Sequence, residues 1–267
     1  MKTVLITGAS TGIGKSIGEH LLAKGYQVYG TSRNPSKFPY SKLRLLAVDV
    51  RDQTSIEAAV ATILAESGQI DVLINNAGVG VAGGVEEVPM DEIRNNFEVN
   101  FFGPIQVMKA VLPSMRARRS GLLVNITSIA GYMGLPYRGA YSASKSALSI
   151  LSEAVAMEVR GFGIRVCCVA PGDFATNIAA GRFHAPVMEG SDYATGYQKT
   201  LDLMNDHVDS GDNPLEMARA IEQIIASQNP KILYKVGSFL QKFSVVLKFV
   251  LPDLWYQKML MRHYKML

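Results

Sequence analysis

The amino-acid sequence predicts an α/β protein in which helices cover both faces of a doubly wound parallel sheet of about seven strands. Short apolar runs alternate with runs of helical period along residues 2–236, which is typical of successive strand–helix–strand units. A glycine-rich turn joins the first strand to the first helix. A chain of 267 residues with a hydrophobic fraction of 48% suits one large domain better than two small ones.

Each expected element has its own signal in the sequence. Strands are expected in seven mostly apolar runs, at residues 2–6, 27–31, 43–48, 71–75, 122–127, 164–169 and 231–236. Helices are expected at residues 15–24, 54–67, 90–118, 140–160 and 214–226. The third helix should break or bend near Gly103 and Pro104. Asn213 should cap the last helix, with Pro214 at its first position.

The expected organisation is one domain over residues 1–237, followed by an extension of the same domain over residues 238–267. Residues 172–212 lack a regular period, and a segment this long inside a compact domain is usually a lid or binding loop. The extension alternates apolar and basic residues in two helix-like pieces that Pro252 separates.

The charge and the cysteines narrow the class of protein. Residues 231–267 carry seven Lys or Arg against Asp253, a balance of +6, so the rest of the chain sums to −2 within the total of +4. The basic balance belongs to the extension and gives no reason to expect nucleic-acid binding.

Cys167 and Cys168 are adjacent in a strand, so their thiols point to opposite faces and stay unpaired, as in a reducing cytoplasm. No apolar run is long enough to span a membrane, and no histidine has a second ligand at metal spacing.

Candidate catalytic groups lie between residues 128 and 145. Tyr141 and Lys145 are four residues apart, so a helix places the ammonium one turn beyond the phenol. A nearby positive charge favours phenolate, and such a tyrosine can exchange a proton with a carbonyl or alcohol oxygen near neutral pH. Ser128, at the end of a strand, can hydrogen-bond the same oxygen. The same spacing is also common on ordinary helix surfaces.

A glycine turn, T-G-A-S-T-G-I-G at residues 7–14, joins the first strand to the first helix. Glycines there allow the backbone to approach a pyrophosphate, whose charge is met by the amides at the helix N-terminus. The position of the turn favours a dinucleotide site over a plain tight turn.

Five spaced motifs together resemble the short-chain dehydrogenase/reductase superfamily. They are the glycine turn, N-N-A-G at residues 75–78, Ser128 at the end of the fifth strand, Y-S-A-S-K at residues 141–145 and Pro171-Gly172 after the sixth strand. The correspondence runs from about residue 2 to residue 236. The resemblance implies a Rossmann-type sheet and an oxidoreductase that transfers a hydride between a nicotinamide cofactor and a carbonyl or alcohol.

The resemblance also implies a role for each matching residue. Ser128, Tyr141 and Lys145 would form a catalytic tetrad with Asn100, which in the superfamily holds a proton-relay water near the lysine. Asp49 and Val50 would flank the adenine ring, Lys145 would bind the nicotinamide ribose, and Pro171, Gly172 and Thr176 would contact the nicotinamide. The remaining implied cofactor contacts are Gly8, Ser10, Gly12, Ile13, Gly14, Asn75, Asn76, Ala77, Gly78 and Tyr141.

The end of the second strand predicts which nicotinamide cofactor binds. An acid there would bond the 2′-hydroxyl of the adenosine ribose, whereas an arginine suits a 2′-phosphate. The strand ends in Ser32 and Arg33, with no carboxylate nearby. Arg33 can pair with phosphate through two parallel hydrogen bonds and Ser32 can add one more, which favours NADP(H).

The expected substrate is a small hydrophobic ketone or aldehyde, or its alcohol. The long extension resembles those of hydroxysteroid and retinol dehydrogenase-like members, where it helps to cover an apolar substrate. The candidates to line the substrate pocket are Met133, Leu135, Tyr137, Phe174, Met188 and Tyr193. Relatives usually pair through two long helices, here near residues 100–115 and 140–159, so the resemblance implies a homodimer or homotetramer.

Three alternatives remain open. One is a 3-oxoacyl thioester reductase, against which the long extension argues. Another is a non-catalytic regulator that binds NADPH, for which the pairing of Tyr141 with Lys145 would have no chemical use. A third is a peripheral membrane module, because the lysines of the extension would suit a weak contact with anionic lipid.

Overall fold

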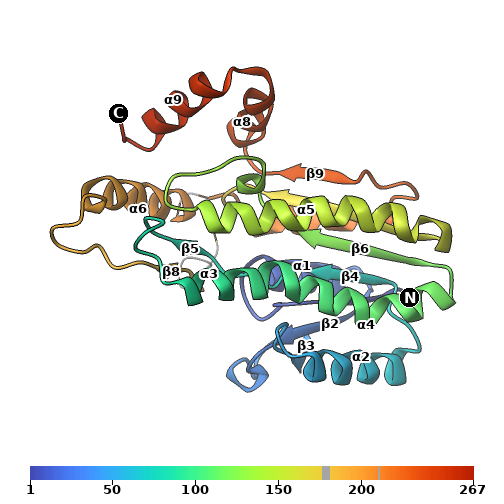
Figure 1. The fold of residues 1–267 in the computed structure, drawn as a ribbon. Coiled ribbons are helices and arrows are strands. Elements are labelled where there is room, and N and C mark those ends of the chain that lie inside the picture. The colour runs from blue at the N-terminus through green and yellow to red at the C-terminus, as the bar shows by residue number, and fades with distance from the viewer. Residues whose placement is uncertain (176–180, 210) are drawn as a thin grey trace.

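A parallel sheet of seven strands forms the centre of the protein, in the order β3-β2-β1-β4-β6-β7-β9 (Figure 1). The structure is a computed structural model that describes residues 1–175, 181–209 and 211–267. Its strands are β1 Thr3–Ile6, β2 Gln27–Ser32, β3 Arg44–Ala47, β4 Val72–Asn75, β6 Gly121–Ile126, β7 Ile164–Pro171 and β9 Leu233–Val236. The predicted strands are confirmed. The chain winds outward from β1 in one direction and from β4 in the other, so the carboxyl ends of β1 and β4 mark the switch point where ligands bind such sheets.

Helices cover both faces of the sheet. They are α1 Gly12–Ala23 and α7 Pro214–Ala226 on one face, and α2 Gln53–Ser67, α4 Gly103–Ala117 and α5 Gly139–Val159 on the other. Strand β1 shows why both faces need a cover of helices. Val4 and Ile6 pack with α1 and α7 on one face, whereas Leu5 packs with the helices on the other face. Successive residues of a strand face opposite ways, so a strand buried on both faces reads as a continuous apolar run.

The predicted break in the third helix is a π-helical turn, Glu98–Phe102. It separates α3, Met90–Phe97, from α4. Pro104 lies in the first turn of α4, directly after the π turn. Such π turns are frequent at functional sites, and this one contains Asn100.

The segment expected to be a loop contains regular structure that the sequence did not reveal. Strand β8, Phe183–His184, pairs in parallel with β5, Val81–Ala82, and α6 spans Ala194–Asp209. Tyr197 of α6 is fully buried, and its hydroxyl donates to the Ala82 carbonyl at 3.1 Å. The buried residues Tyr197 and Met204 lie on the apolar face of α6, and Gly196 and Asp202 of the same helix weaken the helical signal in the sequence.

The extension forms two helices that Pro252 separates, as predicted. They are α8, Phe239–Val250, which begins with a capping box of Ser238 and Gln241, and α9, Asp253–His263. Val245 and Tyr256 are buried against Ile129 and Met133 beside the carboxyl ends of the strands. Figure 1 shows α8 and α9 beyond β9, at the edge of the sheet opposite to β3. None of the helices in the described ranges has the length and apolar character needed to cross a membrane.

We expect both cysteines to be inert in the folded protein. Cys167 and Cys168 are free and buried in β7, and burial raises the pKa of the Cys167 thiol to about 12 and that of Cys168 to about 11. The thiolate is the nucleophile, so neither should react with iodoacetamide near neutral pH, and both should react after unfolding. Intact-mass measurement checks this. Rapid labelling before unfolding would contradict it.

Candidate functional site

The glycine turn between β1 and α1 requires glycine at two positions, Gly8 and Gly14. Gly8 has a φ of 64°, a left-handed conformation that side chains disfavour. A Cβ atom at Gly14 would lie 2.4 Å from Asn76 Nδ2 and 2.5 Å from the Gly8 carbonyl oxygen. The turn therefore presents a bare backbone cradle at the N-terminus of α1, which is what a pyrophosphate requires.

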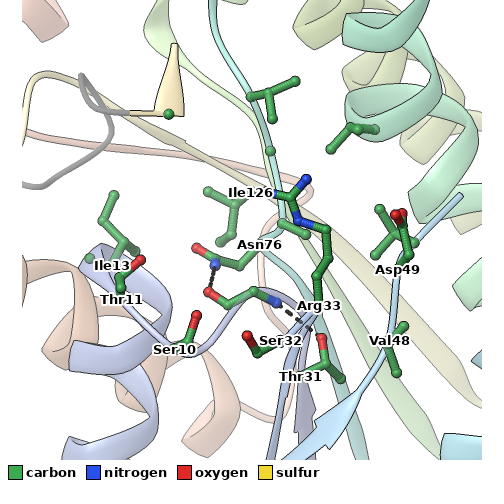
Figure 2. Close-up of a pocket in the computed structure, with 18 of the residues that line it drawn as sticks. Ser10, Thr11, Ile13, Thr31, Ser32, Arg33, Val48, Asp49, Asn76 and Ile126 are labelled. Atoms are coloured by element: carbon green, nitrogen blue, oxygen red, sulfur yellow. Dashed lines mark hydrogen bonds between the residues drawn. The ribbon is translucent and has the colours of Figure 1, made fainter. Parts of the chain in front are cut away.

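Thr7 and Asn76 hold this turn against the end of β4. Thr7 Oγ1 accepts hydrogen bonds from the Asn76 and Ala77 amides, both at 3.0 Å. Asn76 Nδ2 donates to the carbonyls of Thr7 at 2.9 Å and Gly8 at 3.0 Å. Figure 2 shows the Asn76 side chain directed at the turn. Thr7 was not predicted as a site residue, although its place at the start of the glycine motif was a signal.

Asn75 does not line the cofactor site as the sequence suggested. Its side chain is buried on the face of the sheet that α4 and α5 cover, where Nδ2 donates to Asn125 Oδ1 at 2.9 Å. Asn125 Nδ2 in turn donates to Ser152 Oγ at 2.8 Å, so this chain of polar groups ties β4 and β6 to α5. The alternation of side chains along an extended segment sends Asn75 to one face and Asn76 to the other.

Replacing Gly14 with Ala should damage both folding and nucleotide binding. The added methyl group meets atoms of the turn on two sides, and overpacking of this kind typically costs about 1–3 kcal/mol in the free energy of unfolding. Thermal unfolding and a NADPH titration measure the two effects. Gly161→Ala is the matched control, because its Cβ would meet no described atom within 4 Å. Equal unfolding temperatures and equal NADPH affinities of the two variants would contradict the expectation that Gly14 is tightly packed.

A cleft of about 430 Å³ runs from this turn to Lys145, over the carboxyl ends of the strands. The predicted cofactor residues that line it are Gly8, Ser10, Gly12, Ile13, Ser32, Arg33, Asp49, Val50, Asn76, Ala77, Gly78, Tyr141, Lys145 and Pro171. Gly14 does not line the cleft and lies instead against Gly8 and Asn76. Gly172 lies instead against the extension, where a Cβ would be 2.0 Å from Gln241 Oε1. Thr176 lies outside the described residues.

The adenosine end of the cleft is basic. Figure 2 shows Arg33 extending from the end of β2 into the cleft, which Lys37 also lines. Asp49, nearby, is held by Arg51 at 2.6 Å, and the hydrogen bond from Arg51 keeps the Asp49 pKa below its ordinary value. The charge of Arg51 is thus balanced by Asp49. Arg33 and Lys37, in contrast, have no acidic hydrogen-bond partner among the described residues.

Lys145 lies at the other end of the cleft, one helical turn from Tyr141 on α5. Its side chain is buried, and Nζ donates to the Ile126 carbonyl at 3.0 Å. Burial lowers the pKa of Lys145, and the nearby Tyr141 acts in the opposite direction. A Cβ at Gly78 would be 3.1 Å from Asn100 Oδ1 and 3.3 Å from Lys145 Nζ, so Asn100 and Lys145 meet across Gly78.

Asn100 uses its whole side chain to hold the segment that follows β4. Its Oδ1 accepts from the Val79 amide and its Nδ2 donates to the Val79 carbonyl, both at 2.9 Å. Nδ2 also donates to Ser144 Oγ at 3.2 Å. These contacts give Asn100 a positioning role next to Lys145. The water-holding role that the sequence resemblance implied stays a prediction.

Ser128 begins the 3₁₀ turn Ile129–Tyr132 that packs on α5. Its Oγ accepts a hydrogen bond from the Ala130 amide at 3.1 Å, so its own proton remains for another acceptor. The Arg138 guanidinium lies 5.4 Å from the centre of the Tyr141 ring. Tyr141 therefore has a cation on its ring, a second cation one turn along the helix, and an open side that lines the cleft.

A second cavity of about 320 Å³ adjoins the catalytic end of α5. Its lining is mostly apolar and consists of Val81, Gly83, Gly84, Val85, Val88, Ile93, Leu135, Pro136, Tyr137, Gly139, Ala140, Tyr193 and Met266. Leu135, Tyr137 and Tyr193 were predicted to line a substrate pocket, and the structure brings them together here. Phe174 and Met133 are instead buried in the core, and Met188 is exposed away from this lining.

The site is that of an oxidoreductase family. A model of the short chain dehydrogenase family matches residues 2–186. The chain therefore belongs to the short-chain dehydrogenase family, as its motifs predicted.

Particular relatives are similar over nearly the whole chain. A 3-ketodihydrosphingosine reductase of Bacteroides thetaiotaomicron is 43% identical over 251 residues, which cover 94% of this chain and 93% of that protein. A solved short-chain dehydrogenase from Streptomyces avermitilis superimposes with a TM-score of 0.77 at 33% identity, covering 93% of this chain and 97% of that one. The structure of ElxO with NADP bound gives a TM-score of 0.70 at 28% identity, with 88% and 96% covered.

Proposed function

We propose that the protein reduces a long-chain ketone that carries polar groups beside its carbonyl, with NADPH as the reductant. 3-Ketodihydrosphingosine, named in the relative at 43% identity, is a substrate of this kind. The observation that carries the proposal is the apolar cavity lined by Ala140, the residue before Tyr141. An aliphatic chain lying there would bring a ketone at its polar end to the catalytic tyrosine.

NADP(H) is the cofactor that the cleft fits. The cradle at Gly8 and Gly14 admits a pyrophosphate, and the cleft continues from it to both Arg33 and Lys145. ElxO, which resembles this chain over most of its length, binds NADP. Arg33 and Lys37 supply the positive charge that a 2′-phosphate requires.

Polar groups next to Tyr141 favour an amphiphilic substrate over a plain hydrocarbon ketone. Arg182 is largely buried and interacts electrostatically with Arg138, Tyr141 and Asp173. Burial lowers the Arg182 pKa, and one of its guanidinium nitrogens is buried without a hydrogen-bond partner among the described residues. Arg182 lines neither cavity, so a hydroxyl beside the ketone would bind this donor once the Arg182 side chain turns toward Tyr141. Retinal and 3-ketosteroids have no hydroxyl or amine next to the carbonyl.

The residues of the site divide the reduction between them. Bound NADPH supplies the hydride that adds to the ketone carbon. Tyr141 donates its phenolic proton to the ketone oxygen, which gives a secondary alcohol. Ser128 donates its remaining proton as a hydrogen bond to the same oxygen. Lys145 uses one N–H on the Ile126 carbonyl and keeps two for the Tyr141 oxygen and the ribose hydroxyls.

A substrate panel tests the proposal. We would compare 3-ketodihydrosphingosine, shorter-chain analogues, ketosteroids, retinal and acetoacetyl thioesters by following NADPH absorbance. Each methylene removed from the chain should lower kcat/KM about fourfold while the chain still fills the cavity. Val88→Trp should reduce turnover of the long chain and leave a short ketone unaffected, because Val88 lines only the apolar cavity. Preferred turnover of thioesters, ketosteroids or retinal would overturn the assignment.

We also propose that the protein is a homodimer or homotetramer joined through α4 and α5. Ile150 and Met157 on α5 and Phe102 before α4 are large apolar side chains that remain exposed in the single chain. Light scattering should give a multiple of the 29.0 kDa chain mass. Ile150→Lys with Met157→Lys should give the monomer, and Tyr40→Lys, at a 97% exposed residue elsewhere, should not.

The proposed compartment is a reducing cytoplasm. The free thiols of Cys167 and Cys168 support this, because unpaired cysteines are normal where glutathione keeps thiols reduced. Fractionation of cells that express the protein at natural levels tests it, and recovery only from an oxidising compartment would contradict it.

A further inference from the structure

The outward face of the extension is apolar and has no cover in the structure. The inward face is packed on the rest of the protein, because Val245, Tyr256 and Tyr264 are buried there. Burial raises the pKa of Tyr264, and a hydrogen bond to Arg138 opposes this, so the end of the chain is anchored beside the active site. The helices are thus firmly placed, and their exposed side chains form a defined surface.

On α8 four exposed apolar residues form a central stripe, and the exposed Leu240 and Phe249 flank it on either side. Phe239, Phe243, Val246 and Val250 follow the i, i+4, i+7, i+11 spacing of a single helical face. Their exposed fractions range from 42% to 74%, although residues of this type are usually buried. The rings of Phe239 and Phe243 stack at 5.7 Å, which makes the start of the stripe a continuous aromatic surface.

On α9 an exposed apolar end is followed by basic residues. Leu254 and Trp255 are 69% and 68% exposed at the first turn. Lys258 and Arg262 lie on the same side of the helix, one and two turns further on. Tryptophan is enriched where an apolar phase meets water, and basic side chains beside it suit anionic head groups.

The positive charge of this segment is largely uncompensated. Its single acid, Asp253, pairs with Lys248 at 2.9 Å. Lys242, Lys258, Arg262 and Lys265 have no acidic partner within the described part of the chain. A second copy of the same surface would therefore be repelled, whereas an anionic lipid surface is complementary both to the charge and to the apolar stripe.

We propose that α8 and α9 dock on the surface of an anionic phospholipid bilayer. The stripe of α8 and the Leu254–Trp255 pair enter the head-group region, and the basic residues contact lipid phosphates. The helices lie in the plane of the surface, since 12 and 11 residues are too few to cross a bilayer. Met266, which follows them, lines the apolar cavity. The segment that carries the docked helices therefore reaches that cavity through Met266, and the docking itself does not depend on which ketone is reduced.

Vesicle sedimentation tests the docking. The purified full chain should pellet with vesicles of phosphatidylcholine and phosphatidylglycerol, pellet far less with phosphatidylcholine alone, and be released by added salt. Lys242→Gln, Lys258→Gln and Arg262→Gln should together weaken binding about fivefold for each charge removed. Phe239→Ser with Phe243→Ser should weaken it by roughly tenfold or more.

Controls separate docking from folding and from self-association. Tyr40→Ser with Lys42→Gln removes one exposed aromatic and one base before β3, at the opposite edge of the sheet, and should bind vesicles as the wild type does. Thermal unfolding and NADPH affinity should be unchanged in all variants, because the altered side chains are exposed. The proposal is overturned if the wild type stays in the supernatant, or if the Phe variant pellets equally well. It is also overturned if that variant changes the oligomer mass, since the face would then meet another copy.

Discussion

Tyr141→Phe is expected to lower kcat by about 10²–10⁴-fold while NADPH still binds, because the variant loses the proton donor and little else. Tyr141 lines the cleft at the point where Lys145 and the apolar cavity meet, and the ring itself remains in the variant. The affinity for NADPH should change by no more than the roughly fivefold that one neutral hydrogen bond of about 1 kcal/mol supplies. Stopped-flow turnover and a fluorescence titration of NADPH measure the two quantities.

A neighbouring hydroxyl provides the control for this result. Tyr132→Phe removes the same group from the 3₁₀ turn beside α5, and kcat should stay near the wild-type value. Lys145→Met combined with Tyr141→Phe should cost little more than Tyr141→Phe alone, because groups that act as one unit are strongly non-additive. Wild-type rates in Tyr141→Phe would show that another group protonates the ketone oxygen.

The parts of the site that rest on local pattern were predictable from the sequence. The glycine turn and the spacing of Tyr141 and Lys145 each depend on neighbouring residues in one segment, so the motifs placed them correctly. The strands were equally clear, because burial on both faces forces a continuous apolar run. The family match over residues 2–186 is consistent with this, since it covers the same motifs.

Contacts between distant segments could not be predicted. Gly172 packs on Gln241, which also donates to Asp173 Oδ2 at 2.8 Å, and nothing in the motif Pro171-Gly172 indicates a partner so far along the chain. The pairing of Asn100 with the Val79 backbone depends on a π turn, and Gly103 and Pro104 indicate a break there without indicating which backbone groups Asn100 binds. The apolar cavity likewise combines residues near Val81, Tyr137 and Met266, which only the fold brings together.

Removing the Arg33 side chain should lower NADPH affinity by about 10–150-fold and leave NADH affinity unchanged. The expected loss follows from hydrogen bonds to a charged group, which contribute about 1.5–3 kcal/mol, and NADH has no 2′-phosphate to lose them. Arg33→Ala is the variant, and parallel titrations with the two cofactors are the measurement. Arg44→Ala, on the neighbouring strand, is the control for net charge, because Arg44 pairs with Glu66 and does not line the cleft.

Two further substitutions at the same position test whether Arg33 recognises the 2′-phosphate. Arg33→Lys should recover only part of the NADPH affinity, since an ammonium cannot make two parallel hydrogen bonds to a phosphate. Arg33→Asp should reverse the preference toward NADH, because a carboxylate repels the 2′-phosphate and accepts a hydrogen bond from the 2′-hydroxyl. If Arg33→Asp still prefers NADPH, Lys37, which lines the same end of the cleft, carries the recognition in place of Arg33.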